Sequence, residues 1–177
     1  MNETWPVAEL DAVRRLRVIA RTTPGASFAD HLLAAPFDRV WALASDLETQ
    51  MPRLITDISA FTVTSAAGEH LEARARSPLG MRARFDIVLR PGWCLMQSRF
   101  VLGGMAAVPE GDGTRFAFFG ALRIPGLRLI DRALHPLVDP LGAKALKRFT
   151  DQLEQAEPPG SARAGRRPPG ADGTTGP

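Results

Sequence analysis

Asp30, Asp57 and His135 are the ionisable side chains of this sequence that are best placed for acid–base chemistry. Asp30 lies in phase with Phe28 in one predicted strand, and Asp57 lies in phase with Phe61 in another. A carboxyl group buried among apolar side chains has a raised pKa, which suits it to act as a general acid or base. Asp57 also stands at the start of its strand, where a solvent-exposed carboxylate is the simpler interpretation. The catalytic residues are therefore unassigned, with Asp30, Asp57 and His135 as the candidates.

His135 precedes Pro136 inside the last apolar pattern of the chain, residues 127–156. Apolar residues recur there with a period near 3.6, which predicts an amphipathic helix. Proline lacks an amide hydrogen and clashes with the preceding turn, and Asp139 before Pro140 is typical of a helix start. We therefore expect a shorter helix, a break, and a main helix from Pro140 onward. A break near His135 would open onto any cavity that the helix covers.

Other reactive residue types form no pattern that predicts a metal site or a cofactor. The histidines have no metal-ligand spacing, and the sequence contains no HExxH, paired CxxC, GxSxG or P-loop motif. Cys94 is the single cysteine, which excludes an internal disulfide. It has no obvious activating partner, so we expect a small, buried, apolar side chain.

Alternation of apolar and polar residues predicts that most of the chain before residue 127 forms a sheet. Strands are predicted over residues 26–34, 55–65, 70–77, 81–90, 93–102, 105–108 and 114–124, and short helices over residues 36–45 and 46–54. A long amphipathic helix that follows so many strands needs a sheet to bury its apolar stripe. The sequence therefore predicts an α+β fold, in which a curved antiparallel sheet of about seven strands wraps around a long C-terminal helix.

Side chains that face the helix in this arrangement are candidates for a ligand pocket, because such pockets are mostly apolar. The predicted inner set is Phe28, Leu32, Leu71, Ala73, Ala75, Met81, Phe85, Ile87, Met96, Ser98, Phe100, Phe116, Phe118 and Leu122. The ligand-binding candidates are Phe85, Met96, Ser98, Phe100, Phe116, Phe118, Leu134 and Val138. Small residues such as Ala73 and Gly120 would leave space instead of filling it. A dry, fully packed core would produce the same pattern, and that alternative stays open.

Arginines occupy the opposite face of the predicted strands. They are Arg74, Arg76, Arg82, Arg84, Arg99 and Arg115. A partner-binding module that uses this face is a third hypothesis, but a solvated face with Glu72 and Asp86 as ion-pair partners is the simpler interpretation. The net charge is only +3, and the aromatic residues lie on the other face, so nucleic-acid binding is not expected.

The apolar runs of the sequence are too short for a membrane span, since none reaches the roughly 18–20 residues that a transmembrane helix needs. Arginines at positions 14, 15 and 17 interrupt the hydrophobic region that a signal peptide would require. A cytoplasmic location is therefore the expectation. The oligomeric state is not determined by the sequence.

The order of elements resembles the helix-grip fold of the START-like, or SRPBCC, superfamily, which includes polyketide cyclase/dehydrase-like proteins. Residues 35–63 (APFDRVWALASDLETQMPRLITDISAFTV) are similar to the opening of that family, residues 111–126 to its last hairpin, and residues 129–155 to its terminal helix. The resemblance covers residues 26–156. Residues 1–25 are then a lead-in with a predicted short helix. Residues 157–177 are a predicted disordered tail, because they contain almost no large apolar side chain.

The resemblance implies a deep cavity between the sheet and the C-terminal helix. Our leading hypothesis is a protein that binds a small hydrophobic or aromatic molecule in that cavity. The alternative is an enzyme of the aromatase/cyclase or dehydratase kind, in which a buried aspartate or histidine moves protons. Fold alone does not decide between them.

Overall fold

The structure, a computed structural model, describes residues 9–122 and 131–155, with side chains of the last helix described from Gly142 onward. Its elements are α1 (Ala12–Thr22), β1 (Ala26–Leu33), α2 (Phe37–Ser45), α3 (Leu47–Leu54), β2 (Ala60–Ala67), β3 (His70–Arg76), β4 (Arg82–Arg90), β5 (Trp93–Gln97), β6 (Val101–Glu110), β7 (Gly113–Leu122) and α4 (Asp131–Gln155). The lead-in does contain a helix, α1, and the predicted tail lies outside the described residues.

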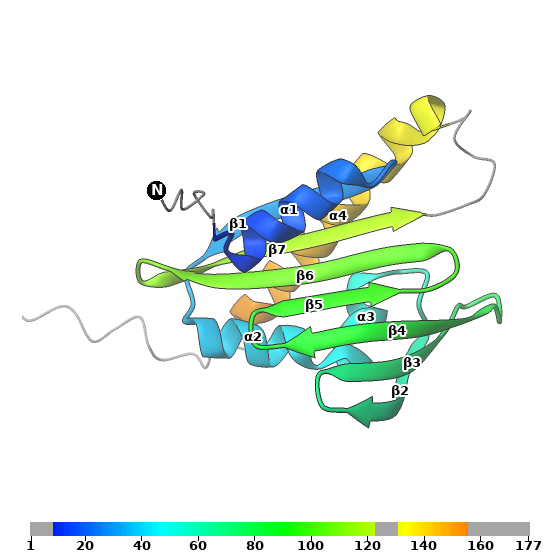
Figure 1. Cartoon of the computed structure of the whole chain (residues 1–177), viewed down its shortest axis with the longest axis horizontal. Coiled ribbons are helices and arrows are strands. Elements are labelled where there is room, and N and C mark those ends of the chain that lie inside the picture. The colour runs from blue at the N-terminus through cyan, green and yellow to red at the C-terminus, as the bar shows by residue number, and fades with distance from the viewer. Residues whose placement is uncertain (1–8, 123–130, 156–177) are drawn as a thin grey trace, which may run out of the picture.

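All the described strands belong to one antiparallel sheet of seven strands, in the order β1-β7-β6-β5-β4-β3-β2. Figure 1 shows this curved sheet with α1 on one face and α2, α3 and α4 on the other. We call these the outer and the inner face. The arrangement confirms the predicted α+β helix-grip fold with a long C-terminal helix.

The predicted break in the C-terminal helix is wrong, because α4 is a single helix from Asp131 to Gln155. Pro136 and Pro140 both lie inside it. A proline removes one backbone hydrogen bond and crowds one turn, which distorts a helix without necessarily ending it. The break expected near His135 is therefore absent from α4, and the side chain of His135 lies outside the described residues.

Strand β5 is shorter than predicted, because the chain turns at Ser98 and does not continue to Leu102. Ser98 closes the turn by donating its backbone N–H to the carbonyl of Val101 (2.7 Å) and accepting the Val101 N–H on its Oγ (3.0 Å). Gly103 and Gly104 lie inside β6, the strand that follows this turn. A Cβ atom at Gly104 would lie 2.8 Å from the carbonyl oxygen of Cys94 and 3.0 Å from Leu16 Cδ1. Gly104 is therefore required for close packing of α1.

Two apolar cores lie on the two faces of the sheet. The inner core joins the sheet to α2, α3 and α4, and the outer core joins it to α1 through Val13, Leu16 and Ala20. The outer core corrects the predicted phase of β1. Phe28 pairs with Phe119 and packs under α1, and Leu32 is 45% exposed, so neither faces α4. Both faces of β1 carry apolar residues, so the alternation in the sequence does not show which face is the inner one. The packing of α1 on the outer face decides it.

The inner set also loses members at the end of the sheet where β3, β5 and β7 finish (Figure 1). Met81 is 66% exposed, Leu122 is 51% exposed and Phe100 is 46% exposed. Leu122 ends β7 and pairs with Val101, which follows Phe100, and Met81 precedes the start of β4. This end of the sheet therefore presents large apolar side chains to solvent.

Candidate ligand-binding interior

Four of the predicted ligand-binding residues come together in the inner core. Phe85, Met96, Phe116 and Phe118 are contributed by β4, β5 and β7, and each is at most 8% exposed. The ring of Phe116 stacks on that of Phe149 in α4, with centroids 4.4 Å apart. The Phe85 ring lies 5.7 Å from that of Phe61. The interior is therefore lined by aromatic and thioether groups, which suits apolar contacts.

A row of small residues crosses the middle of this face. Ser27, Gly120 and Gly103 are direct neighbours on β1, β7 and β6, and Met96 continues the row on β5. Apart from its chain neighbours, no atom of the described residues lies within 4 Å of a Cβ atom built on Gly120, and a Cβ at Gly103 meets its nearest atom at 3.5 Å. Within the described part of the chain, the inner face is therefore unfilled over Gly120.

Helix α4 contacts the sheet closely on one side of this row. Gly142 donates its backbone N–H to Ser27 Oγ over 3.0 Å, and a Cβ on Gly142 would lie 2.5 Å from that oxygen. The contact with β1 and the stack on Phe116 fix the helix on one flank of the sheet. Ser27, which the backbone of Gly142 contacts, is thus the direct neighbour of Gly120, over which no described residue fills the inner face.

Ser98 and Phe100 lie away from the centre of the interior. Ser98 is partly buried and its hydroxyl serves the β5–β6 turn, and Phe100 is exposed in the same turn, with the Arg99 guanidinium 5.1 Å from its ring. Leu134 and Val138 belong to α4, but their side chains lie outside the described residues.

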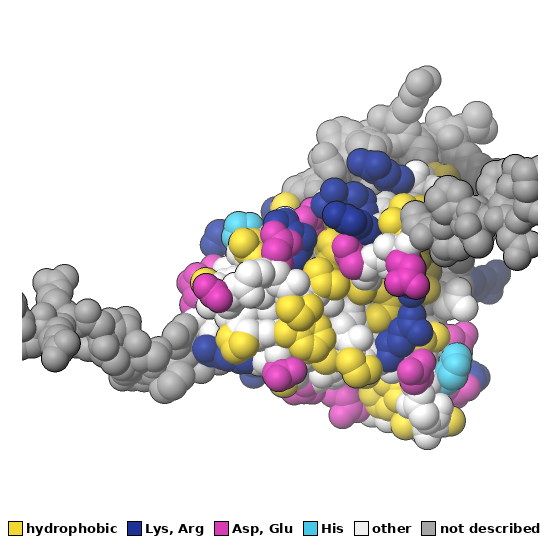
Figure 2. Space-filling model, turned by 60° about the vertical axis from the view of Figure 1, so that its left-hand side comes forward, with side chains coloured by type: hydrophobic (Ala, Val, Ile, Leu, Met, Phe, Trp, Pro, Cys, Tyr) yellow, Lys and Arg dark blue, Asp and Glu magenta, His cyan; other side chains and the backbone are white. Residues whose placement is uncertain are grey.

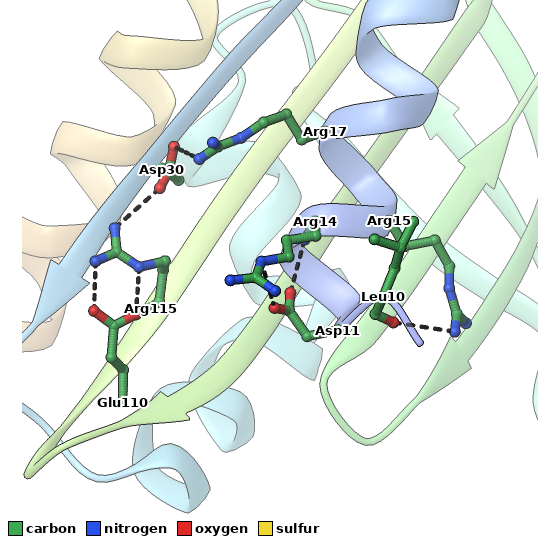
Figure 3. A network of polar contacts seen from close by, with 8 residues as sticks. All are labelled: Leu10, Asp11, Arg14, Arg15, Arg17, Asp30, Glu110 and Arg115. Carbon is green, nitrogen blue, oxygen red and sulfur yellow. Dashed lines mark hydrogen bonds and ion pairs between the residues drawn. The ribbon is translucent and has the colours of Figure 1, made fainter. Parts of the chain in front are cut away.

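Asp30 is on the outer face, contrary to the predicted inner position. Its carboxylate pairs with Arg17 of α1 at 2.8 Å and with Arg115 of β7 at 3.1 Å, and its side chain is 18% exposed (Figure 3). The register explains the change, because Asp30 shares its phase with Phe28, which packs under α1. The carboxylate therefore holds α1, β1 and β7 together and does not reach the interior.

The network continues to Glu110, whose carboxylate accepts hydrogen bonds from Arg115 Nε at 2.5 Å and from an Arg115 terminal nitrogen at 2.6 Å (Figure 3). This bidentate bond with Arg115 lowers the pKa of Glu110. The same bond, with a further contribution from Asp30, raises the pKa of Arg115. The network is thus a structural ion-pair chain that links α1, β1, β6 and β7.

Of the remaining acid–base candidates, Asp57 does not reach the interior, and the side chain of His135 lies outside the described residues. Asp57 lies in the turn between α3 and β2 and is exposed, because β2 begins at Ala60 and not at Ile55. His31 and His70 are exposed. Burial raises the pKa of the Cys94 thiol to about 12, so the predicted small apolar role of this residue agrees with its position in the core.

Three buried polar residues were not identified from the sequence: Ser27, Gln50 and Thr114. Ser27 receives the Gly142 N–H, and Thr114 Oγ1 donates to the carbonyl of Ala35 at 2.8 Å. The amide oxygen of Gln50 has no hydrogen-bond partner among the described residues. The sequence signal for Gln50 was its spacing from Leu47 and Leu54, which places it on the apolar face of α3.

A separate hollow of about 390 Å³ lies on the outer face between α1 and β1. It is lined by Arg17, Ala20, Arg21, Ala26, Phe28 and Asp30. Figure 2 shows one face of the molecule, on which acidic and basic side chains are interspersed without a large patch of one sign.

Within residues 9–122 and 131–155, no group of three or more His, Cys, Asp and Glu side chains is arranged to hold a metal ion. In the same part of the chain, no helix has the length and apolar character that crossing a membrane requires.

Comparison with known proteins supports the fold. No protein-family model matches the sequence, and no curated protein matches it significantly. Among solved structures, the chain is similar to TTHA0849 from Thermus thermophilus, with a TM-score of 0.58 and 23% identity over 75% of this chain and 99% of that one. It is also similar to the Zhui aromatase/cyclase from Streptomyces sp. R1128, with a TM-score of 0.58 and 13% identity over 73% of this chain and 93% of that one.

A third similar structure is the STAR-related lipid transfer protein from Xanthomonas axonopodis, with a TM-score of 0.56 and 13% identity over 72% of this chain and 85% of that one. The chain therefore has the helix-grip fold of the START-like, polyketide cyclase-like proteins. At these identities the likeness concerns the fold.

Proposed function

We propose that this protein binds a small hydrophobic or aromatic molecule between the inner face of the sheet and α4. The observation that carries the proposal is that no atom of the described residues, chain neighbours aside, lies within 4 Å of a Cβ built on Gly120, in a row of small residues that buried aromatic side chains flank. Similar folds in an aromatase/cyclase and a lipid transfer protein support it.

Binding in this proposal comes from the removal of apolar surface from water, which contributes about 25 cal/mol per Å². Phe85, Met96, Phe116 and Phe118 supply the walls in this proposal, and Leu134 and Val138 of α4 stay predicted ligand-binding residues. Ser98 and Phe100 belong to the open end of the sheet, where the ligand enters. The protein acts in the cytoplasm, as its sequence led us to expect.

The space above Gly120 provides the test. Replacement by phenylalanine (Gly120→Phe) fills this space, and it should weaken binding of the fluorescent probe 1-anilinonaphthalene-8-sulfonate at least about tenfold, a difference of about 1.4 kcal/mol. The Cβ atom of the new residue meets no atom of the described residues within 4 Å beyond its chain neighbours, so we expect the variant to fold. Ala60→Phe, at an exposed position of β2, is the matched control and should leave probe binding unchanged.

Native mass spectrometry of the gently purified protein should show a co-purifying small molecule, which Gly120→Phe should lose. If Gly120→Phe strongly destabilises the protein and the wild type binds no apolar probe, the interior is a dry core and the proposal is wrong.

The alternative, an aromatase/cyclase-like or dehydratase-like enzyme, has less support. Asp30 is engaged in ion pairs on the outer face, and Asp57 is exposed in a turn. Of the named candidates only His135 is left, and its side chain lies outside the described residues. Binding without chemistry therefore stands as the main proposal.

A further inference from the structure

Gln50 is a polar residue in an apolar position. It lies in α3, one turn from both Leu47 and Leu54, and all three side chains are buried. Gln50 is only 1% exposed, and Leu47, Met51 and Leu54 belong to the inner core together with Phe61 and Phe85. Helical geometry therefore directs the Gln50 amide toward the region between the sheet and α4.

The amide oxygen of Gln50 accepts no hydrogen bond from the described residues. Two other buried polar residues do have partners: Ser27 accepts the Gly142 N–H at 3.0 Å, and Thr114 donates to the Ala35 carbonyl at 2.8 Å. The amide oxygen of Gln152, in α4, shares the lack of a partner among the described residues. Buried amides are nearly always hydrogen-bonded, because the loss of water's hydrogen bonds is otherwise uncompensated. A buried acceptor without a partner, on the apolar side of α3, is the kind of polar group that can fix the orientation of a bound molecule.

We propose that Gln50 Oε1 accepts a hydrogen bond from a hydroxyl or N–H group of the ligand. The ligand class is then an apolar, preferably aromatic, body that carries one hydrogen-bond donor, as a phenol does. This inference rests on the proposed binding function and adds the polar contact that determines specificity. A site that hydrogen-bonds a ligand donor discriminates against analogues without it, since their binding leaves the buried acceptor unpaired.

Matched probes separate this contact from apolar binding. Naphthalene, 2-naphthol and 2-methoxynaphthalene share one ring system, but only 2-naphthol carries a donor. Wild-type protein should bind 2-naphthol more tightly than the other two in fluorescence titrations. In Gln50→Met, which keeps the length of the side chain and removes the amide, the ratio of the Kd values for naphthalene and 2-naphthol should fall by about tenfold. Naphthalene itself should bind as well as before.

Gln152→Met is the matched control. Gln152 lies in α4, its amide oxygen also has no partner among the described residues, and its side chain is only partly buried. It should keep the wild-type preference for 2-naphthol. Loss of the preference in this variant and not in Gln50→Met would overturn the assignment to Gln50.

A second measurement uses the protein without any probe. Removal of an unpaired buried amide should stabilise it, so the Tm of Gln50→Met should rise by about 2–4 °C in a chain of this size. A lower Tm would show that the amide is already satisfied, for instance by an internal water, and would overturn the inference.

The outcomes of the titration separate the two proposals. If none of the three probes binds the wild type, the binding function itself is wrong. If all three bind equally well, or if Gln50→Met keeps the preference for 2-naphthol, apolar binding stands and the role of Gln50 is wrong.

Discussion

Both faces of the sheet bury apolar side chains, and glycine has a different role on each. On the outer face, Gly104 lets α1 approach so closely that an added Cβ would lie 3.0 Å from Leu16 Cδ1. On the inner face, a Cβ built on Gly120 meets no atom of the described residues within 4 Å beyond its chain neighbours. One glycine allows contact and the other leaves space. Among the described residues, the inner face is therefore unfilled over Gly120, whereas the described part of α4 contacts the sheet at Ser27.

The outer face also divides in two, because α1 covers only part of the sheet, over β1, β6 and β7. On β3 and β4, the outer side chains form like-charged pairs directly across the strands: Arg74 with Arg84, Arg76 with Arg82, and Glu72 with Asp86. Such pairs are mildly unfavourable when they stand alone. The contact of Arg84 with Glu72 at 2.5 Å offsets one of them. This part is best explained as a solvated surface.

Among these variants, the loss of a large side chain from the inner core should lower the free energy of unfolding most. Phe149→Ala removes a fully buried ring that stacks on Phe116, so we expect a loss of about 3–5 kcal/mol in the free energy of unfolding. Denaturant unfolding measures this loss. Binding of the apolar probe should change as well, because the ring forms part of the interior. If the folded variant binds the probe as the wild type does, Phe149 does not line the ligand site.

Loss of an outer side chain should affect stability alone. Leu16→Ala empties a fully buried position beneath α1, and we expect a loss of about 3 kcal/mol. Probe affinity, measured where the variant is still folded, should match that of the wild type. A Leu16→Ala variant with weakened binding would show that the two faces are coupled.

The ion-pair network on the outer face should contribute less. Asp30→Asn leaves the Arg17 and Arg115 guanidinium groups without their shared carboxylate, and we expect a loss of about 1 kcal/mol. The difference from wild type in urea unfolding should shrink at high salt, because part of the interaction is exposed to screening. Binding of the apolar probe should not change. If binding of the probe falls while the stability is unchanged, Asp30 has a functional role.

The sequence predicted the sheet, the long helix and most of the buried aromatic residues, because alternation of polar and apolar residues records which face of a strand is buried. It did not predict the phase of β1. Phe28 and Leu33 are both apolar and point to opposite faces, so the decision depends on α1, which covers one of them. The position of Asp30 followed from that phase and was wrong for the same reason.

The role of Gln50 was missed for a different reason. Its spacing on α3 was visible, but the sequence does not distinguish a glutamine on an exposed helix from a glutamine with a buried, unpaired amide. Only the position of α4 and the sheet around α3 shows that the amide has no partner among the described residues. Pattern thus predicts which surfaces are buried, whereas hydrogen-bond satisfaction depends on tertiary contacts that no local pattern contains.

The arginine pairs should show the smallest effect and test whether the uncovered outer surface is only solvated. Arg82→Gln removes one member of the pair with Arg76, so the free energy of unfolding should rise slightly, by less than about 0.5 kcal/mol, and more at low salt than at high salt. Arg84→Gln, in the neighbouring arginine pair, should instead lower the free energy of unfolding, because it loses the contact with Glu72. If Arg82→Gln instead destabilises the protein by more than about 1 kcal/mol, the arginine has a partner in the fold, and the outer surface of β3 and β4 is more than a solvated face.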